Sequence, residues 1–157
     1  MKIVFATNNV HKLREVSQTL GEDFTLVTPR ECGVTEDIPE NEATLEGNAL
    51  AKARYIRSRT GLDCFADDTG LEVENRRARF RTAIALIDAD GEHIFEGVVE
   101  GRIAREERGA DGFGYDPLFV PDGCDRTFAE MPADEKNAVS HRGRAVRRLA
   151  EYLQNRR

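Results

Sequence analysis

Apolar positions in the first half of the chain alternate between strand-like runs and helical spacing. Residues 3–6 form a short apolar run that predicts a buried strand, and apolar side chains then recur at helical spacing over 13–20. A second strand is expected at 24–28. Helical spacing returns over 45–56, and Gly61 marks the end of that helix.

The second half of the chain is richer in strands. Asp88-Ala89-Asp90-Gly91 has the composition of a hairpin turn, and Ser140 is suited to cap a last amphipathic helix. The expected strands cover residues 64–66, 71–73, 80–87, 94–103 and 118–120. Strands and helices interleaved around one hairpin predict a single α/β domain over residues 1–157, with a mixed β-sheet and flanking helices.

Composition and charge exclude several classes of protein. Hydrophobic residues make up 39% of the chain and charged residues 33%, which excludes a collagen, a low-complexity chain and a membrane bundle. The net charge of -6 argues against a nucleic-acid polymer as partner, but a local positive pocket could still bind a small anion. Because no apolar stretch is long enough for a membrane span, we expect no membrane partner and a cytoplasmic location.

The first group of candidate residues lies where the first strand meets the first helix. The free N–H groups and the dipole of a helix start attract phosphate, and a lysine in the first turn adds a positive charge. An ordinary asparagine-capped helix with a surface lysine is the alternative. The residues of this junction are Thr7, Asn8, Asn9, Val10, His11 and Lys12.

Acidic residues form a second group. Asp67 and Asp68 precede Thr69-Gly70, and Glu40 lies in an acidic loop before the second helix. Neighbouring strand side chains point to opposite faces, so one aspartate can face a cleft while the other holds the backbone. Paired carboxylates suit a hard cation or a general base. A polar turn at 67–70 and a solvated acidic loop are the alternatives.

A third group joins an aromatic loop to a basic segment. Glycine lets the backbone approach a ligand, two aromatic rings can clamp a flat base, and arginine presents donors to a carbonyl oxygen or a phosphate. Core packing and a hydrogen-bonded histidine at a helix start are the alternatives. The residues are Phe113, Gly114, Tyr115, Asp116, Lys136, His141 and Arg142.

These motifs together resemble those of the inosine/xanthosine triphosphate pyrophosphatase family. The matching segments occur in the family's order and cover 5–12, 40–54, 66–71, 113–119 and 135–142. The resemblance implies an elongated mixed β-sheet with two lobes around a central cleft, in a protein that pairs as a homodimer. It also implies hydrolysis of ITP, dITP and XTP to the monophosphate and pyrophosphate, which removes non-standard purines from the nucleotide pool.

For this reaction we expect Mg²⁺ to be held by Glu40 and Asp68, with Asp68 also activating the attacking water. The same pattern also fits the reverse assignment, with the roles of Asp67 and Asp68 exchanged. Residues 7–12 and Lys136 would neutralise phosphate charge, Thr69 would donate to a phosphate oxygen, and Arg142 would read the base. A nucleotide-binding regulator without turnover and a sugar-phosphate phosphatase are the competing functions.

One segment departs from the family pattern. The family has a glycine-rich stretch, a Ser-Ala-Arg sequence and a helix after the strand that ends here at Glu74, and a few dozen residues are missing at this place. Either the chain lacks this segment, or the natural protein carries it between Glu74 and Asn75. Since the strand ends without a turn signal, we expect a break between Glu74 and Asn75.

Overall fold

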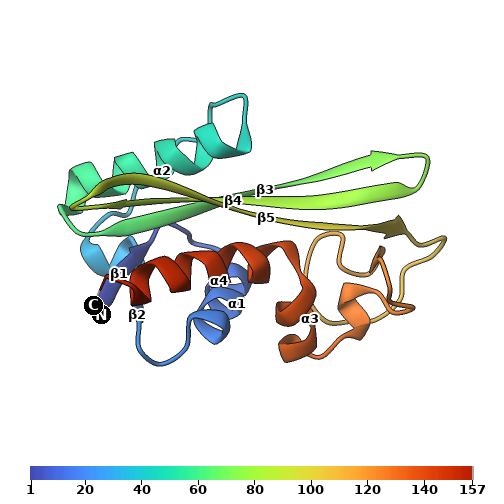
Figure 1. The fold of residues 1–157 in the computed structure, drawn as a ribbon. Helices are drawn as coiled ribbons and strands as arrows, with labels where there is room; N and C mark the ends of the chain where they lie inside the picture. Colours follow the sequence, from blue (N-terminus) through green and yellow to red (C-terminus); the bar gives the residue numbers. More distant parts are fainter. Residues whose placement is uncertain (157) are drawn as a thin grey trace.

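A six-stranded mixed β-sheet forms the centre of the protein, seen in a computed structural model that describes residues 1–156 (Figure 1). The strand order is β2-β1-β3-β4-β5-β6. The first pairings, β1 with β2 and β1 with β3, are parallel, and the other three are antiparallel. The strands are β1 (Lys2–Phe5), β2 (Thr25–Val27), β3 (Cys64–Glu74), β4 (Arg77–Asp88), β5 (Gly91–Ile103) and β6 (Phe119–Pro121).

Helices cover both faces of this sheet. In Figure 1, α2 lies on one face, while α1, α3 and α4 lie on the other. The three longest strands extend past the end of α2, so the sheet is elongated. The helices are α1 (Val10–Leu20), α2 (Leu45–Thr60), α3 (Ala133–Val139) and α4 (His141–Gln154), with short 3-10 helices η1 (Arg30–Cys32) and η2 (Phe128–Glu130).

Three apolar clusters hold these layers together. Phe5, Phe65 and Leu149 belong to the cluster between the sheet and α1 with α4, and Ile56 belongs to the cluster under α2. The third cluster surrounds Phe128 and fills the far half of the sheet, where it forms a second lobe. The predicted α/β class and the elongated mixed sheet are confirmed.

Local signals place the helices as the sequence predicts. The side chain of Asn9 accepts hydrogen bonds from the amides of residues 11 and 12 at the start of α1, and Ser140 accepts one from Gly143 at the start of α4. Gly61 ends α2 in the left-handed conformation. The predicted hairpin turn is also present, because Asp88 pairs directly with Gly91. The sequence did not predict α3.

One prediction about the acidic segment is corrected. Residues 67–70 do not form a polar turn between two strands, because β3 runs without interruption from Cys64 to Glu74 and pairs with β4 along its whole length. Asp67 therefore points toward α1 and α4, and Asp68 points toward α2. The polar residues belong to the sheet itself, which gives their side chains fixed directions.

The expected break after Glu74 is wrong for this chain. Glu74 pairs with Arg77, and Asn75 and Arg76 form the two-residue turn between them with φ of 49° and 69°. This is the left-handed backbone of a tight hairpin turn, which asparagine adopts readily. The carbonyl of Arg76 also accepts a hydrogen bond of 2.9 Å from Ile103. The sequence offered no glycine or proline here, so the turn was missed.

Relief of backbone strain at this turn tests the hairpin. The change Arg76→Gly should raise the free energy of unfolding by roughly 0.5–1 kcal/mol. A residue with a side chain costs about 1–2 kcal/mol in the left-handed conformation, and glycine removes this cost. Part of the gain is cancelled because glycine makes the unfolded chain more flexible. Urea unfolding measures it. Asn75→Gly is the matched control and should change stability less. A destabilised Arg76→Gly protein would mean that the turn differs from the one described.

Candidate active site

The carboxylate of Asp67 lies at the centre of a group of buried charges. Lys12 of α1 is 3.1 Å from its Oδ1, and the Nε of Arg142 in α4 donates to its Oδ2 at 3.0 Å. Lys52 of α2 donates to the backbone carbonyl of Asp67 at 2.7 Å. The side chain of Asp67 is only 2% exposed. One position on β3 therefore ties together three helices.

The surrounding cations set the ionisation of Asp67. Burial by itself would raise the pKa of this carboxyl, but the charges of Arg142, Lys12 and Lys52 outweigh burial and lower the pKa from 3.8 to about 2. Asp67 is therefore a constant anion near neutral pH and a poor proton acceptor. This property favours a structural and electrostatic role for Asp67 over that of a general base.

Asp68 lies on the opposite face of β3 and is more open. Its side chain is 18% exposed, and the amide of Asn48 in α2 donates to its Oδ2 at 3.0 Å. Lys52 lies between two carboxylates, with its Nζ 2.6 Å from Glu40 and 4.0 Å from Asp68. The carboxylates of Glu40 and Asp68 thus converge on one cationic position.

This donor set fits a divalent cation. Mg²⁺ binds through one or two protein carboxylates together with substrate phosphates, and Glu40 and Asp68 supply oxygens of that kind. Within residues 1–156, no three His, Cys, Asp or Glu side chains form a metal cluster. The chain by itself therefore offers a partial coordination sphere, which a triphosphate would have to complete.

Glu15 of α1 is a residue that the sequence reasoning missed. It accepts a hydrogen bond from Arg142 at 2.6 Å and also binds the ammonium of Lys136, which lies 2.7 Å from Asp116. Glu15 follows Lys12 by three residues, so both lie on one side of α1. That spacing is visible in the sequence, but its partners are more than a hundred residues away.

Two hollows open on the two sides of the start of α1. One has a volume of about 370 Å³ and the other of about 240 Å³. The first is lined by Thr7, Asn8, Asn9, Lys12, Asp37, Glu40 and Lys52. The second is lined by His11, Glu15, Phe113, Phe128, Lys136 and Asn137, among others. We call them the polar hollow and the ring hollow.

The predicted residues 7–12 are divided between these hollows. Lys12 lines the polar hollow and His11 the ring hollow, whereas the side chain of Val10 is 67% exposed and lines neither. The imidazole of His11 stacks on Phe113, with ring centroids 5.0 Å apart. The start of α1 thus presents a charge to one side and a flat ring to the other.

The predicted pair of clamping rings is corrected. Phe113 faces the ring hollow, but Tyr115 is 57% exposed and neither it nor Gly114 lines either hollow. In the described part of the chain, the ring beside Phe113 is that of His11. Asp116 stays buried and accepts from the amide of Phe113 at 2.8 Å, which holds the loop in place.

Arg142 and Thr69 are more constrained than the sequence predicted. Arg142 is 3% exposed and donates to Asp67, Glu15 and Thr69. The hydroxyl of Thr69 is also hydrogen-bonded to Thr82 at 2.7 Å. Thr69 therefore points into this network and does not line the polar hollow. Replacing Arg142 would remove one cationic partner from each of two buried carboxylates, Asp67 and Glu15, so it is a poor site for a selectivity test.

His141 is buried beside the same network. Its ring stacks on Phe80, with centroids 4.5 Å apart. Burial, reinforced by the charges of Arg142 and Lys136, holds the pKa of His141 well below its usual value, so the ring is neutral. Its Nδ1 has no hydrogen-bond partner in the described structure, which contradicts the alternative of a fully hydrogen-bonded helix-start histidine.

Comparison with known proteins adds a family to this geometry. The sequence model of the Ham1 family matches residues 3–75 and 72–152. The chain belongs to the Ham1 family. A dITP/XTP pyrophosphatase of Porphyromonas gingivalis is 45% identical to it, over 97% of each chain. The family resemblance carried by the motifs is confirmed.

Solved structures of the Ham1 family agree with the fold. The Ham1 protein of Staphylococcus aureus superposes with a TM-score of 0.86 over all of both chains, at 28% identity. A HAM1 protein from Coxiella burnetii gives the same TM-score at 34% identity, over 99% of each chain. No helix among residues 1–156 is both long and apolar enough to cross a membrane.

The short hairpin is where this Ham1 chain departs from its family. The two matched stretches meet at residues 72–75, next to the turn at Asn75 and Arg76. The alignment with the relative from P. gingivalis spans 188 positions, more than the 157 residues present here. Both observations agree with a chain that lacks an internal family segment.

The charge network predicts how stability responds to Asp67→Asn. Its folded pKa of about 2 lies below the usual 3.8, so ionised Asp67 stabilises the fold above about pH 4, and this contribution is lost as the pH falls toward 2. The variant should lose about 3–5 kcal/mol of unfolding free energy near pH 7, because Arg142 and Lys12 lose a buried partner. It should also lose less stability than wild type on acidification.

Urea unfolding at several pH values between about 7 and 3 measures both effects. Asp68→Asn is the control, because Asp68 is partly exposed and makes fewer charged contacts. Equal stability of the two variants near pH 7 would remove Asp67 from the centre of the network.

Proposed function

We propose that this chain hydrolyses non-standard purine nucleoside triphosphates, ITP, dITP and XTP, to the monophosphate and pyrophosphate. The observation that carries the proposal is the pair of hollows at the start of α1, one lined by lysines and carboxylates and the other by flat rings. Their common border at His11 and Lys12 suits a ligand with a charged end and a planar end. The relative from P. gingivalis, named a dITP/XTP pyrophosphatase, supports this substrate class.

The polar hollow is proposed to hold the triphosphate. Lys12 and Lys52 would offset the charge of the phosphates and of the leaving pyrophosphate. Glu40 and Asp68 would hold Mg²⁺, which when bound would further neutralise the triphosphate. Since Lys52 already lies between these carboxylates, its ammonium would have to shift toward the phosphates when the cation binds.

Asp68 is the proposed general base. It is the more exposed of the two aspartates, and Asn48 and the amide of Thr69 orient its carboxylate with bonds of 3.0 and 3.1 Å. Asp68 would accept a proton from the attacking water, whose oxygen forms the new bond to phosphorus as the bond to pyrophosphate breaks. Asp67, held as an anion by three cations, would keep Lys12 and Arg142 in place.

The ring hollow is proposed to hold the purine. Lys136 donates to Glu15 and Asp116, which leaves one N–H of its ammonium for a ligand. That N–H would favour the 6-oxo group of hypoxanthine or xanthine over the 6-amino group of adenine. Arg142 and His141 do not line this hollow but would support its rings from behind, with the guanidinium of Arg142 5.7 Å from the Phe113 centroid and the ring of His141 6.1 Å from that of Phe128.

We also propose that the enzyme works as a homodimer and needs no nucleic-acid polymer. These statements rest on the family resemblance and on the net charge. Light scattering of the purified protein would give the subunit number.

A panel of substrates tests the proposed reaction. Purified protein with Mg²⁺ is given ITP, dITP, XTP, GTP and ATP, and the products are resolved as pyrophosphate or orthophosphate. We expect pyrophosphate from the first three and little product from ATP. Orthophosphate that is released regardless of the base would support a phosphatase, and binding without any product would support a nucleotide-binding regulator. Activity without a divalent cation would exclude the role given to Mg²⁺.

Asp68→Asn should lower turnover in this assay by about a hundredfold or more, because the amide can neither accept the proton nor supply an anionic ligand. Its circular dichroism should match that of wild type. Glu22→Gln, at an exposed carboxylate outside both hollows, is the control and should keep full activity. Turnover of Asp68→Asn close to that of wild type would assign the proton acceptor elsewhere.

His11→Ala should raise KM by roughly threefold to tenfold and leave kcat within about twofold, because ring stacking worth about 0.5–1.5 kcal/mol is lost from binding alone. His11→Phe should restore the wild-type KM, since it keeps a flat ring beside Phe113. Steady-state kinetics with ITP measure both values. Ser17→Ala, exposed on the same helix, is the control. A wild-type KM in His11→Ala would place the base away from this ring.

A further inference from the structure

A third hollow lies at the hairpin end of the sheet and carries an excess of positive charge. It has a volume of about 380 Å³, and among residues 1–156 its lining contains four arginines and one carboxylate, that of Glu106. The arginines are Arg76, Arg102, Arg105 and Arg108. The chain as a whole has a net charge of -6, so this is a local reversal of sign.

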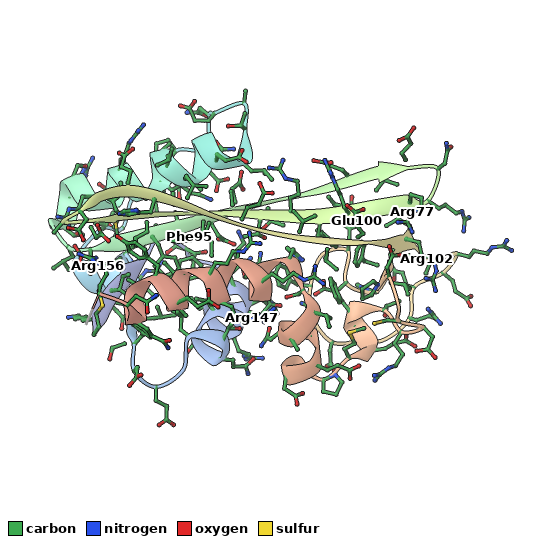
Figure 2. All side chains as sticks on the ribbon, in the orientation of Figure 1. Arg77, Phe95, Glu100, Arg102, Arg147 and Arg156 are labelled. Carbon is green, nitrogen blue, oxygen red and sulfur yellow. The ribbon has the colours of Figure 1, made fainter. Side chains whose placement is uncertain are left out.

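Three of the four guanidinium groups form no hydrogen bond or ion pair in the described part of the chain, although Arg102 still interacts electrostatically with Asp122. Within residues 1–156, the side chains of Arg76, Arg102 and Arg105 form no hydrogen bond or ion pair, and all three are exposed. By contrast, Arg77 beside them is neutralised by Asp122 through two bonds of 3.0 Å. Figure 2 shows Arg77 and Arg102 at this same end of the sheet. Because the positive charges outnumber the carboxylates beside them, they repel each other, and an anion would relieve that repulsion.

The backbone holds these arginines in one place. The carbonyl of Arg76 in the turn accepts from the amide of Ile103, next to Arg102 on β5. The loop that carries Arg105 is held at both ends by backbone hydrogen bonds. The amide of Ala104 donates to the carbonyl of Leu118 at 2.7 Å, and the amide of Arg108 donates to the carbonyl of Pro117 at 2.9 Å. The hollow also has an apolar wall of Ile103, Ala104 and Val120.

We propose that this hollow, the arginine hollow, binds a phosphate-bearing anion at a site separate from the two hollows beside α1. A guanidinium group can bind two phosphate oxygens at once through parallel hydrogen bonds. Three guanidinium groups without an ion pair around one concavity therefore suit an anion with more than one charge. Inorganic pyrophosphate and the phosphate end of a nucleotide share this chemistry. Arg76 reaches the hollow from the short turn at which the two matched stretches of the family model meet, so the site depends on a place where the chain departs from the family pattern.

The site also has a direct link to the ring hollow. Its loop continues from Arg108 into the segment that carries Phe113 and Asp116. Both ends of that segment are hydrogen-bonded to the backbone of one residue, Ala129. An anion that fixes Arg105 and Arg108 would restrict this segment. Binding at the arginine hollow is therefore expected to change KM for the nucleotide more than kcat.

Amide NMR of the isotope-labelled full chain, titrated at constant ionic strength without divalent cation, locates the binding. Pyrophosphate, phosphate and inosine monophosphate are the probes. We expect saturable shifts at residues 103–108 for all three, with pyrophosphate the tightest, and a loss of affinity of about tenfold or more in Arg102→Glu and Arg105→Glu. Stronger binding of the monophosphate than of pyrophosphate would identify a nucleotide as the ligand.

Arg30→Glu, an exposed arginine of η1 outside the hollow, is the control with the same change of charge and should bind as wild type does. Shifts at residues 7–12 report the polar hollow separately, so a failure of the proposed nucleotide site does not affect this reading. The proposal would be overturned by amide shifts confined to residues 7–12, or by chloride causing the same shifts as the phosphate probes. An unchanged affinity of Arg102→Glu for pyrophosphate would also overturn it.

Discussion

The ion pair network around Asp67 is the constraint on which the rest of this structure depends. A buried carboxylate is tolerated only when its charge is paired, and the partners of Asp67 come from α1, α2 and α4. These helices lie on both faces of the sheet. The network therefore fixes the position of α1 relative to β3, and the start of α1 separates the polar hollow from the ring hollow.

Because β3 is continuous, the neighbouring residues Asp67 and Asp68 place their side chains on opposite faces of the sheet. Asp67 and Asp68 are adjacent, yet one is an enclosed anion and the other is partly open beside Glu40. Strand alternation separates them, and the antiparallel pairing with β4 keeps them from turning. A turn at this position would have given the two carboxylates similar surroundings, and the difference between an enclosed carboxylate and a more open one would be lost.

The sequence predicted those features that depend on local chemistry, such as the Asn9 and Ser140 caps and the hairpin at Asp88–Gly91. Of the candidate residues that it indicated, Lys12 and Lys136 line the two hollows and Asp67 lies at the centre of the charge network, whereas Val10 is exposed. It did not predict the role of Glu15 or the exposure of Tyr115, because these depend on contacts between distant segments. The turn after Glu74 was missed because its left-handed residues are Asn and Arg, without glycine.

The part of the sheet beyond α2 shows how a sheet face without a covering helix is kept polar. Apolar side chains on an uncovered sheet face would invite aggregation. Here every second residue of β4 from Arg77 to Arg81 is an arginine, and Glu72, Glu96 and Asp122 pair with them. Ion pairs thus keep this face of the sheet polar. The remaining arginines, at the turn and at the end of β5, form no ion pair among the described residues, and this excess of positive charge distinguishes the arginine hollow from the neutralised surface beside it.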